Sequence, residues 1–237
     1  MQPALATPGT AARIAGFLYL AIVFGGVFAE AFVRQRMLVP GAPAATARNI
    51  LAGDSLYRLG FGVHLFHLAC AVPVAVILYR LLRTVHRGIA QLGLAFDLTS
   101  IAIEGANLLN LYAPLRLLDD AAAFSAGSAQ AMAYASLRLF SSGFGIALVF
   151  FAGFCAATGY LIWRSGFLPR TLGVLMMVAG ACYFANSFLV FLLPHLADAL
   201  FPYILLPCLV AELSLALWLA VVGVRARTWQ ELGPLPA

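Results

Sequence analysis

Residues 56–79 read LYRLGFGVHLFHLACAVPVAVILY, an apolar run with one permanently charged residue, Arg58, near its start. A helix needs about 20 predominantly apolar residues to cross the hydrocarbon layer of a bilayer, and this run is longer than that. Two histidines, His64 and His67, lie inside the run. The stretch therefore predicts a transmembrane helix that has polar side chains within the membrane.

Five other runs have similar length and composition, and they lie at 14–33, 89–112, 139–163, 171–193 and 201–223. The chain of 237 residues is 63% hydrophobic and only 10% charged, far outside the range of soluble domains. Helices satisfy their own backbone hydrogen bonds in lipid, whereas a membrane barrel would show short strands of alternating polarity. We expect an all-α, polytopic bundle of six transmembrane helices that forms a single membrane domain, 1–237.

The basic residues apart from histidine are all arginine, and their positions predict the orientation of the chain. An even number of spans places both termini on one side of the membrane. The short segments on that side contain Arg13, Arg80, Arg83, Arg87, Arg164, Arg170, Arg225 and Arg227. The longer segments on the opposite side contain Arg34, Arg36, Arg48, Arg58, Arg116 and Arg138. Since cytoplasmic segments are enriched in basic residues, we expect both termini in the cytoplasm. Nucleic acid is not an expected partner, because the arginines cluster at span ends rather than on one soluble face.

The two longest segments between spans, about 34–55 and 113–138, are too short to form an independent soluble core. The first is predicted to be an outer loop, with a short interfacial helix over 44–51. The second is rich in alanine and serine, and we expect a flexible connection or a short surface helix there. Pro73 and Pro207 fall inside predicted spans, where a proline can open a helix.

The four cysteines, Cys70, Cys155, Cys182 and Cys208, all fall in apolar runs without a CxxC pair. They are predicted to be small core residues rather than a disulfide framework or a zinc cluster. The segment 29–31 resembles a signal-peptide cleavage site, but the apolar run before it is longer than a usual signal core. We therefore expect a retained first helix.

A polar stripe occupies the third run. Asp97, Ser100, Glu104 and Asn107 recur at spacings of three and four residues, so they share one face of a helix. A lone carboxylate in lipid costs a few kcal/mol, so this face is expected to point inward, toward a cation, a hydrogen-bond donor, water or a proton. Glu104 lies near the middle of the span and is the strongest single functional candidate.

His64 and His67 lie one turn apart, and His67 is expected at a depth similar to that of Glu104. Imidazoles beside a carboxylate suit proton handling. Two imidazoles and a carboxylate could also give three ligands of a metal site, although the HExxH pattern is absent. We expect no cofactor, and metal binding by His64, His67 and Glu104 stays an open alternative.

Polar residues on several other runs are predicted to converge with these on one outward-facing polar cavity. The predicted ligand-binding residues are Glu30, Arg58, His64, His67, Glu104, Asn107, Arg138, Asn186 and Glu212. Each has a structural alternative: a carboxylate paired with Arg58 or Arg138 could simply fix helix packing, and asparagines often form hydrogen bonds between helices.

The motifs RIAGFLYL at 13–20, FAE at 28–30, VPG at 39–41, NILA at 49–52 and SLYRLG at 55–60 resemble a bacterial family of membrane proteins, domain of unknown function 4386. The resemblance is strong over about 12–60, and beyond 60 it is carried mostly by hydropathy. It implies a multi-helix protein of the bacterial inner membrane with a retained first span. It also draws attention to Glu30, Arg34, Asn49 and Arg58, and it implies no activity.

Three functions remain open at this point. The first is an integral membrane protein that binds or moves a small ligand or protons through the polar cavity. The second is a structural or regulatory subunit that acts through helix contacts or a membrane-protein partner. The third is an intramembrane, metal-dependent enzyme that acts on a lipid. The lipid bilayer is the one partner common to all three.

Overall fold

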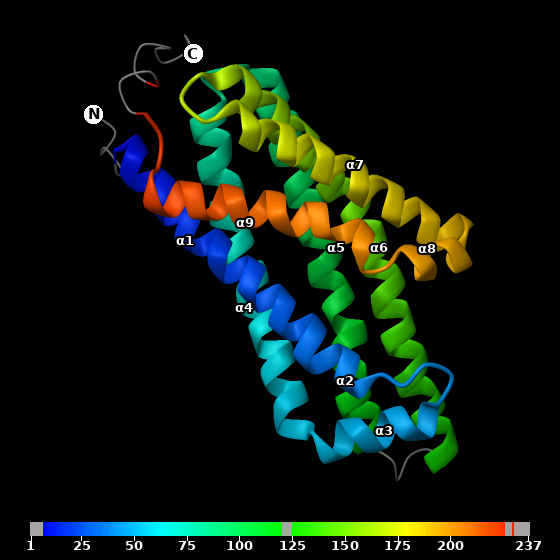
Figure 1. Ribbon diagram of the computed structural model, residues 1–237. Coiled ribbons are helices and arrows are strands. Elements are labelled where there is room, and N and C mark those ends of the chain that lie inside the picture. The colour runs from blue at the N-terminus through cyan, green and yellow to red at the C-terminus, as the bar shows by residue number, and fades with distance from the viewer. Residues whose placement is uncertain (1–6, 120–124, 226–228, 230–237) are drawn as a thin grey trace. The chain divides into compact units, whose positions relative to one another are not determined.

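The computed structural model describes residues 7–119, 125–225 and 229, and every regular element within them is helical (Figure 1). Six of the helices are long and apolar enough to cross a membrane. This confirms the all-α class and the six predicted spans, and the chain is a multi-pass membrane protein. The orientation of the termini stays a prediction.

The first span begins with α1 (Pro8–Val27) and continues through a π-helical segment, η1 (Phe28–Arg34), into α2 (Gln35–Met37). The other long helices are α4 (Asp54–Leu82), α5 (Arg87–Asp119), α6 (Ala126–Ser165), α7 (Arg170–Leu192) and α9 (Leu206–Val221). The short elements are α3 (Pro43–Ala52), α8 (Pro194–Leu200) and the 3₁₀ turn η2 (Tyr203–Leu205).

The helices divide into two compact units, each with its own internal contacts. Unit 1 comprises Met1–Val23, Cys70–Ile101 and Gly145–Ala237, and unit 2 comprises Phe24–Ala69 and Ala102–Phe144. The boundaries fall inside helices, so the first span, α4, α5 and α6 contribute residues to both units, whereas α7 to α9 belong to unit 1 and α3 to unit 2.

The segment 113–138, predicted to be a flexible connection or a short surface helix, is mostly a continuation of long helices. Helix α5 extends to Asp119 and α6 begins at Ala126. Alanine and leucine favour helix, and the buried Ala129, Ala133 and Leu137 give the extension a packed face. With 40 residues, α6 is about 60 Å long, roughly twice the thickness of a hydrocarbon core. Its length therefore exceeds what the membrane requires.

The two prolines predicted to lie inside spans differ in their position along the helix. Pro207 lies inside the sixth span, Tyr203–Val221, as predicted, and within that span it occupies the first turn of α9, directly after η2. At that position a helix has no backbone hydrogen bond for proline to remove. Pro73, in contrast, lies inside α4 as expected. The predicted helix over 44–51 is confirmed as α3, which begins with Pro43.

Close helix contacts in unit 1 depend on small residues. A Cβ on Gly173 of α7 would lie 2.6 Å from the carbonyl oxygen of Gly159 on α6, and a Cβ on Gly16 would lie 2.1 Å from the backbone nitrogen of Ala220 on α9. Only glycine allows such approaches, which are typical of membrane helix packing. The four cysteines are free thiols, and three of them are buried, as predicted.

Candidate functional site

Two helices of unit 2 bring His64, His67 and Glu104 together. Nε2 of His64 on α4 lies 2.8 Å from Oε1 of Glu104 on α5, and Nε2 of His67 lies 3.4 Å from the same oxygen. The three side chains are 9%, 10% and 12% exposed, respectively. We call these three residues the His–Glu cluster. Both histidines reach the carboxylate, and His67 was expected at this depth.

Neighbouring small and aromatic residues enclose the His–Glu cluster. The His64 and His67 rings lie 4.6 Å apart, as their spacing of one turn requires. The rings of His64 and of Phe140 on α6 pack edge to face, with their centroids 5.6 Å apart. On the other side, a Cβ on Gly25 would lie 3.4 Å from Cβ of His67. This is an ordinary van der Waals distance, so the first span packs against His67 at this position.

Hydrogen bonding leaves one nitrogen of the His–Glu cluster unsatisfied. When each Nε2 carries a hydrogen, both imidazoles donate to Glu104, and each Nδ1 becomes an acceptor. Nδ1 of His67 is buried and has no hydrogen-bond partner among the described residues. An unpaired buried polar atom costs about 1–3 kcal/mol. His67 therefore has a hydrogen-bonding nitrogen that no residue described in the structure uses.

The donor atoms of the His–Glu cluster also form a possible metal site. One ligand atom from each residue lies within 4.8 Å of the others. Two imidazole nitrogens and one carboxylate oxygen would leave at least one coordination position open, as in catalytic zinc sites. The arrangement can thus accept a proton, a polar ligand or a metal ion.

Asn107 makes an interhelical contact on the same face of α5. Its Nδ2 donates to the carbonyl oxygen of Phe140 at 2.8 Å, and its Oδ1 accepts from Nδ2 of Asn110 at 3.0 Å. A Cβ on Gly143 would lie only 2.4 Å from that Oδ1, so the glycine gives Asn107 its space. Asn107 thus forms a hydrogen bond between helices, the alternative role that we gave for the asparagines, and this bond joins α5 to α6.

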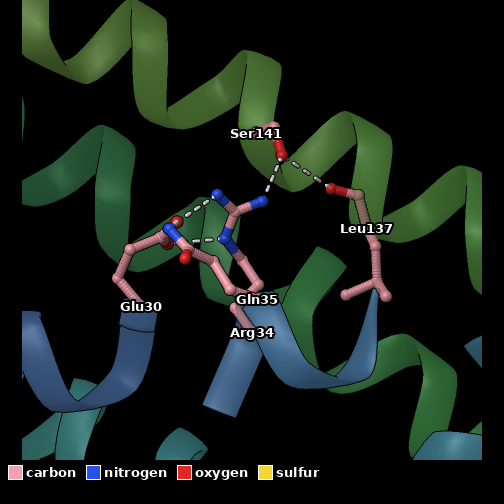
Figure 2. A network of polar contacts seen from close by, with 5 residues as sticks. All are labelled: Glu30, Arg34, Gln35, Leu137 and Ser141. Atoms are coloured by element: carbon pink, nitrogen blue, oxygen red, sulfur yellow. Dashed lines mark hydrogen bonds and ion pairs between the residues drawn. The ribbon is translucent and has the colours of Figure 1, made fainter. Parts of the chain in front are cut away.

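A second polar network surrounds Arg34 at the end of η1. Figure 2 shows the Arg34 guanidinium between the carboxylate of Glu30 and the hydroxyl of Ser141. Nε and Nη2 donate to the two Glu30 oxygens at 2.6 and 2.5 Å, and Nη1 donates to Ser141 Oγ on α6 at 2.9 Å. Ser141 in turn donates to the carbonyl oxygen of Leu137 at 3.2 Å. Glu30 therefore pairs with Arg34, not with the Arg58 or Arg138 that we had considered.

The two arginines predicted to line the site lie elsewhere in unit 2. Arg58 is exposed and pairs with Asp54 at 2.8 Å and with Asp119 at 3.4 Å. The side chain of Arg138 is also exposed. Neither of them makes an ion pair with Glu104, whose partners are the two histidines. Both ion pairs described for Arg58 are therefore surface pairs.

The two remaining predicted site residues belong to unit 1. Asn186 on α7 and Glu212 on α9 are buried, and the Tyr183 hydroxyl donates to Oε1 of Glu212. Asp97 and Ser100 of the polar stripe are buried in this unit as well, where Ser100 Oγ donates to the carbonyl oxygen of Ala147 at 2.9 Å. Seven predicted site residues thus lie in unit 2 and two in unit 1, and the single outward-facing cavity stays a prediction.

Sequence reasoning did not identify Ser141 and Tyr57 as parts of the polar interior, and it singled out Arg34 only through the family resemblance. The spacing of Glu30 and Arg34 could have indicated the pair, since residues four apart face each other on a helix. Tyr57 is 2% exposed, and its hydroxyl donates to the carbonyl oxygen of Leu111 at 2.6 Å. No local signal indicates that contact, because it joins α4 to α5.

Comparison with known proteins places the chain in one family. No curated protein and no solved structure is significantly similar to it. The family model described as Domain of unknown function (DUF4386) matches residues 14–223, which include all six long helices in whole or in part. The match extends well beyond the motifs of the first 60 residues, and the chain therefore belongs to the DUF4386 family.

Proposed function

We propose that this protein binds or moves a small ligand or protons through the polar groups of unit 2, in a bacterial cytoplasmic membrane. The observation that carries the proposal is the His–Glu cluster, in which His64 and His67 share one carboxylate oxygen of Glu104 within membrane-spanning helices. Ionisable residues are rare inside membranes and usually line a pathway or a site.

The contrast with Arg34 supports a binding role for the His–Glu cluster. Arginine carries a permanent charge and has no lone pair to offer, so the Glu30–Arg34 pair is a fixed connection. Imidazoles have lone pairs and can exchange a hydrogen for another cation. A fixed helix contact would not require two such groups around one carboxylate, particularly when Nδ1 of His67 has no hydrogen-bond partner in the described part of the chain.

A flux experiment tests the proposal. The purified protein is reconstituted in liposomes that contain a pH-sensitive dye, and an acid pulse is applied outside. We expect faster dye response with the wild type than in protein-free liposomes, and at least a tenfold slower protein-dependent rate with Glu104→Gln. Asp119→Asn is the matched control, because it removes an exposed carboxylate from the same helix. Equal rates for the wild type and Glu104→Gln would remove the cluster from any proton path.

Hydrogen bonds between helices support a second candidate, a structural or regulatory membrane subunit. Asn107, Tyr57 and Arg34 each bond to a neighbouring helix of unit 2. Under this alternative, Glu104→Gln would lower the thermal stability of the protein and leave the flux unchanged. Stable co-purification of one membrane partner with the wild type would favour this candidate.

A further inference from the structure

We propose that the ligand of the His–Glu cluster is a divalent first-row transition-metal ion, held by Nε2 of His64, Nε2 of His67 and one carboxylate oxygen of Glu104. The inference rests on the proposed function for the statement that this cluster is a ligand site, and it names the chemical class of the ligand. It concerns binding by the cluster and is independent of whether the ion crosses the membrane.

The three donor atoms lie close enough together to bind one metal ion after the side chains rotate. Metal–nitrogen and metal–oxygen bonds of about 2.0–2.1 Å place tetrahedral ligand atoms about 3.3 Å apart. The Glu104 oxygen lies 3.4 Å from Nε2 of His67 and 2.8 Å from Nε2 of His64, and the three ligand atoms lie within 4.8 Å of one another. To form the site, side-chain rotation must separate His64 Nε2 from the carboxylate oxygen by about 0.5 Å and draw together the ligand atoms that now lie up to 4.8 Å apart.

The donor set selects the class of metal. Imidazole nitrogens favour zinc, cobalt, nickel, copper and iron, whereas magnesium and calcium prefer sites made of oxygen atoms. Among the residues that the structure describes, no other group of three histidine, cysteine or carboxylate ligand atoms comes together in this way. Glu30 of unit 2, whose side chain is 37% exposed, is already held by Arg34.

The charge of the site and the hydrogen bonding of His67 determine how an ion would be held at this position. Two imidazoles and a carboxylate replace water around a cation, and a divalent ion bound by one carboxylate and two neutral histidines retains a charge of +1, which favours an anion in the open position. When His67 binds metal through Nε2, its hydrogen lies on Nδ1, and that nitrogen has no acceptor among the described residues. Such an acceptor typically contributes 10–100-fold in metal affinity, so binding should be correspondingly weaker than in fully supported sites.

The test is direct titration of the untagged, full-length protein in detergent after treatment with a chelator. Co²⁺ is the probe, followed by its visible absorption, with metal content measured by elemental analysis. We expect one Co²⁺ per chain, displaced by Zn²⁺, and at least tenfold weaker binding in His67→Gln and in Glu104→Gln. His86→Gln and His195→Gln are matched controls, because both histidines are exposed and lie outside the cluster. Their binding should equal that of the wild type.

Glu104→Gln is suited to this test because its amide oxygen can still accept a hydrogen bond from one imidazole. Circular dichroism and gel filtration of the metal-free variants establish that they fold, and added Zn²⁺ should raise the Tm of the wild type but not that of the cluster variants. Absence of Co²⁺ binding, or binding that is unchanged in both cluster variants, would overturn the inference.

The flux assay separates this inference from the proposed function. One outcome is that metal-free wild type conducts protons, that Glu104→Gln does not, and that the wild type binds no Co²⁺. This outcome would overturn the metal site and support proton movement. Stoichiometric Co²⁺ binding that depends on His67 and Glu104, without proton flux, would support the metal site and exclude proton movement.

Discussion

At the scale of single residues, the Arg34 guanidinium joins two helices of unit 2 by bonding to Glu30 and Ser141. We expect Arg34→Met to destabilise the protein by about 1–3 kcal/mol, because it leaves the Glu30 carboxylate without its cation. Glu30→Gln combined with Arg34→Met should recover part of this loss, since no unpaired charge remains. Thermal unfolding in detergent measures both variants, and a double variant less stable than the single one would show that the charge pairing is not the cause.

Gly143 gives a second prediction at the residue scale. Gly143→Ala places a Cβ 2.4 Å from Oδ1 of Asn107, so the Asn107 side chain must leave its bond to the Phe140 carbonyl oxygen. We expect a loss of about 1–3 kcal/mol, the usual cost of overpacking. Adding Asn107→Ala should relieve the clash. Asn107→Ala should therefore lower the stability of the Gly143→Ala protein by less than it lowers the stability of the wild type. Additive losses in a double-mutant cycle would contradict the contact.

At the scale of elements, the start of α9 is set by η2 and Pro207. Because Pro207 lies in the first turn of α9, Pro207→Ala should change stability by no more than about 0.5 kcal/mol. Val210→Pro is the matched comparison, since Val210 is exposed and one turn further into the same helix. It should cost about 3 kcal/mol through its backbone alone. Unfolding temperatures of the two variants test the placement, and a large loss in Pro207→Ala would contradict it.

At the scale of the whole molecule, the arginine distribution predicts that both termini lie in the cytoplasm. A fluorescent protein fused to the C-terminus should therefore fluoresce in bacterial cells, whereas alkaline phosphatase fused there should be inactive. Fusions of the phosphatase within 39–42, between α2 and α3, should show the opposite behaviour. Phosphatase activity at the C-terminus would reverse the topology and place the loop before α3 inside the cell.

The sequence by itself determined the six helices, the shared face of Asp97, Ser100, Glu104 and Asn107, and the pairing of His64 with His67 on one side of a helix. These features follow from run length and from a period of 3.6 residues, both of which are local. The ends of α5 and α6 were less predictable, because the polar segment between the spans contains good helix formers that can extend a helix beyond the membrane.

Only the tertiary structure decided which polar groups meet. It brought both histidines to Glu104, paired Glu30 with Arg34 rather than with Arg58 or Arg138, and bonded Asn107 to the backbone of α6. These partners depend on which helices are neighbours and on their relative rotation and depth. Burial in a membrane requires each polar group to find a partner, but many packing orders satisfy that requirement, and close contacts such as the one between Gly143 and Asn107 select one of them.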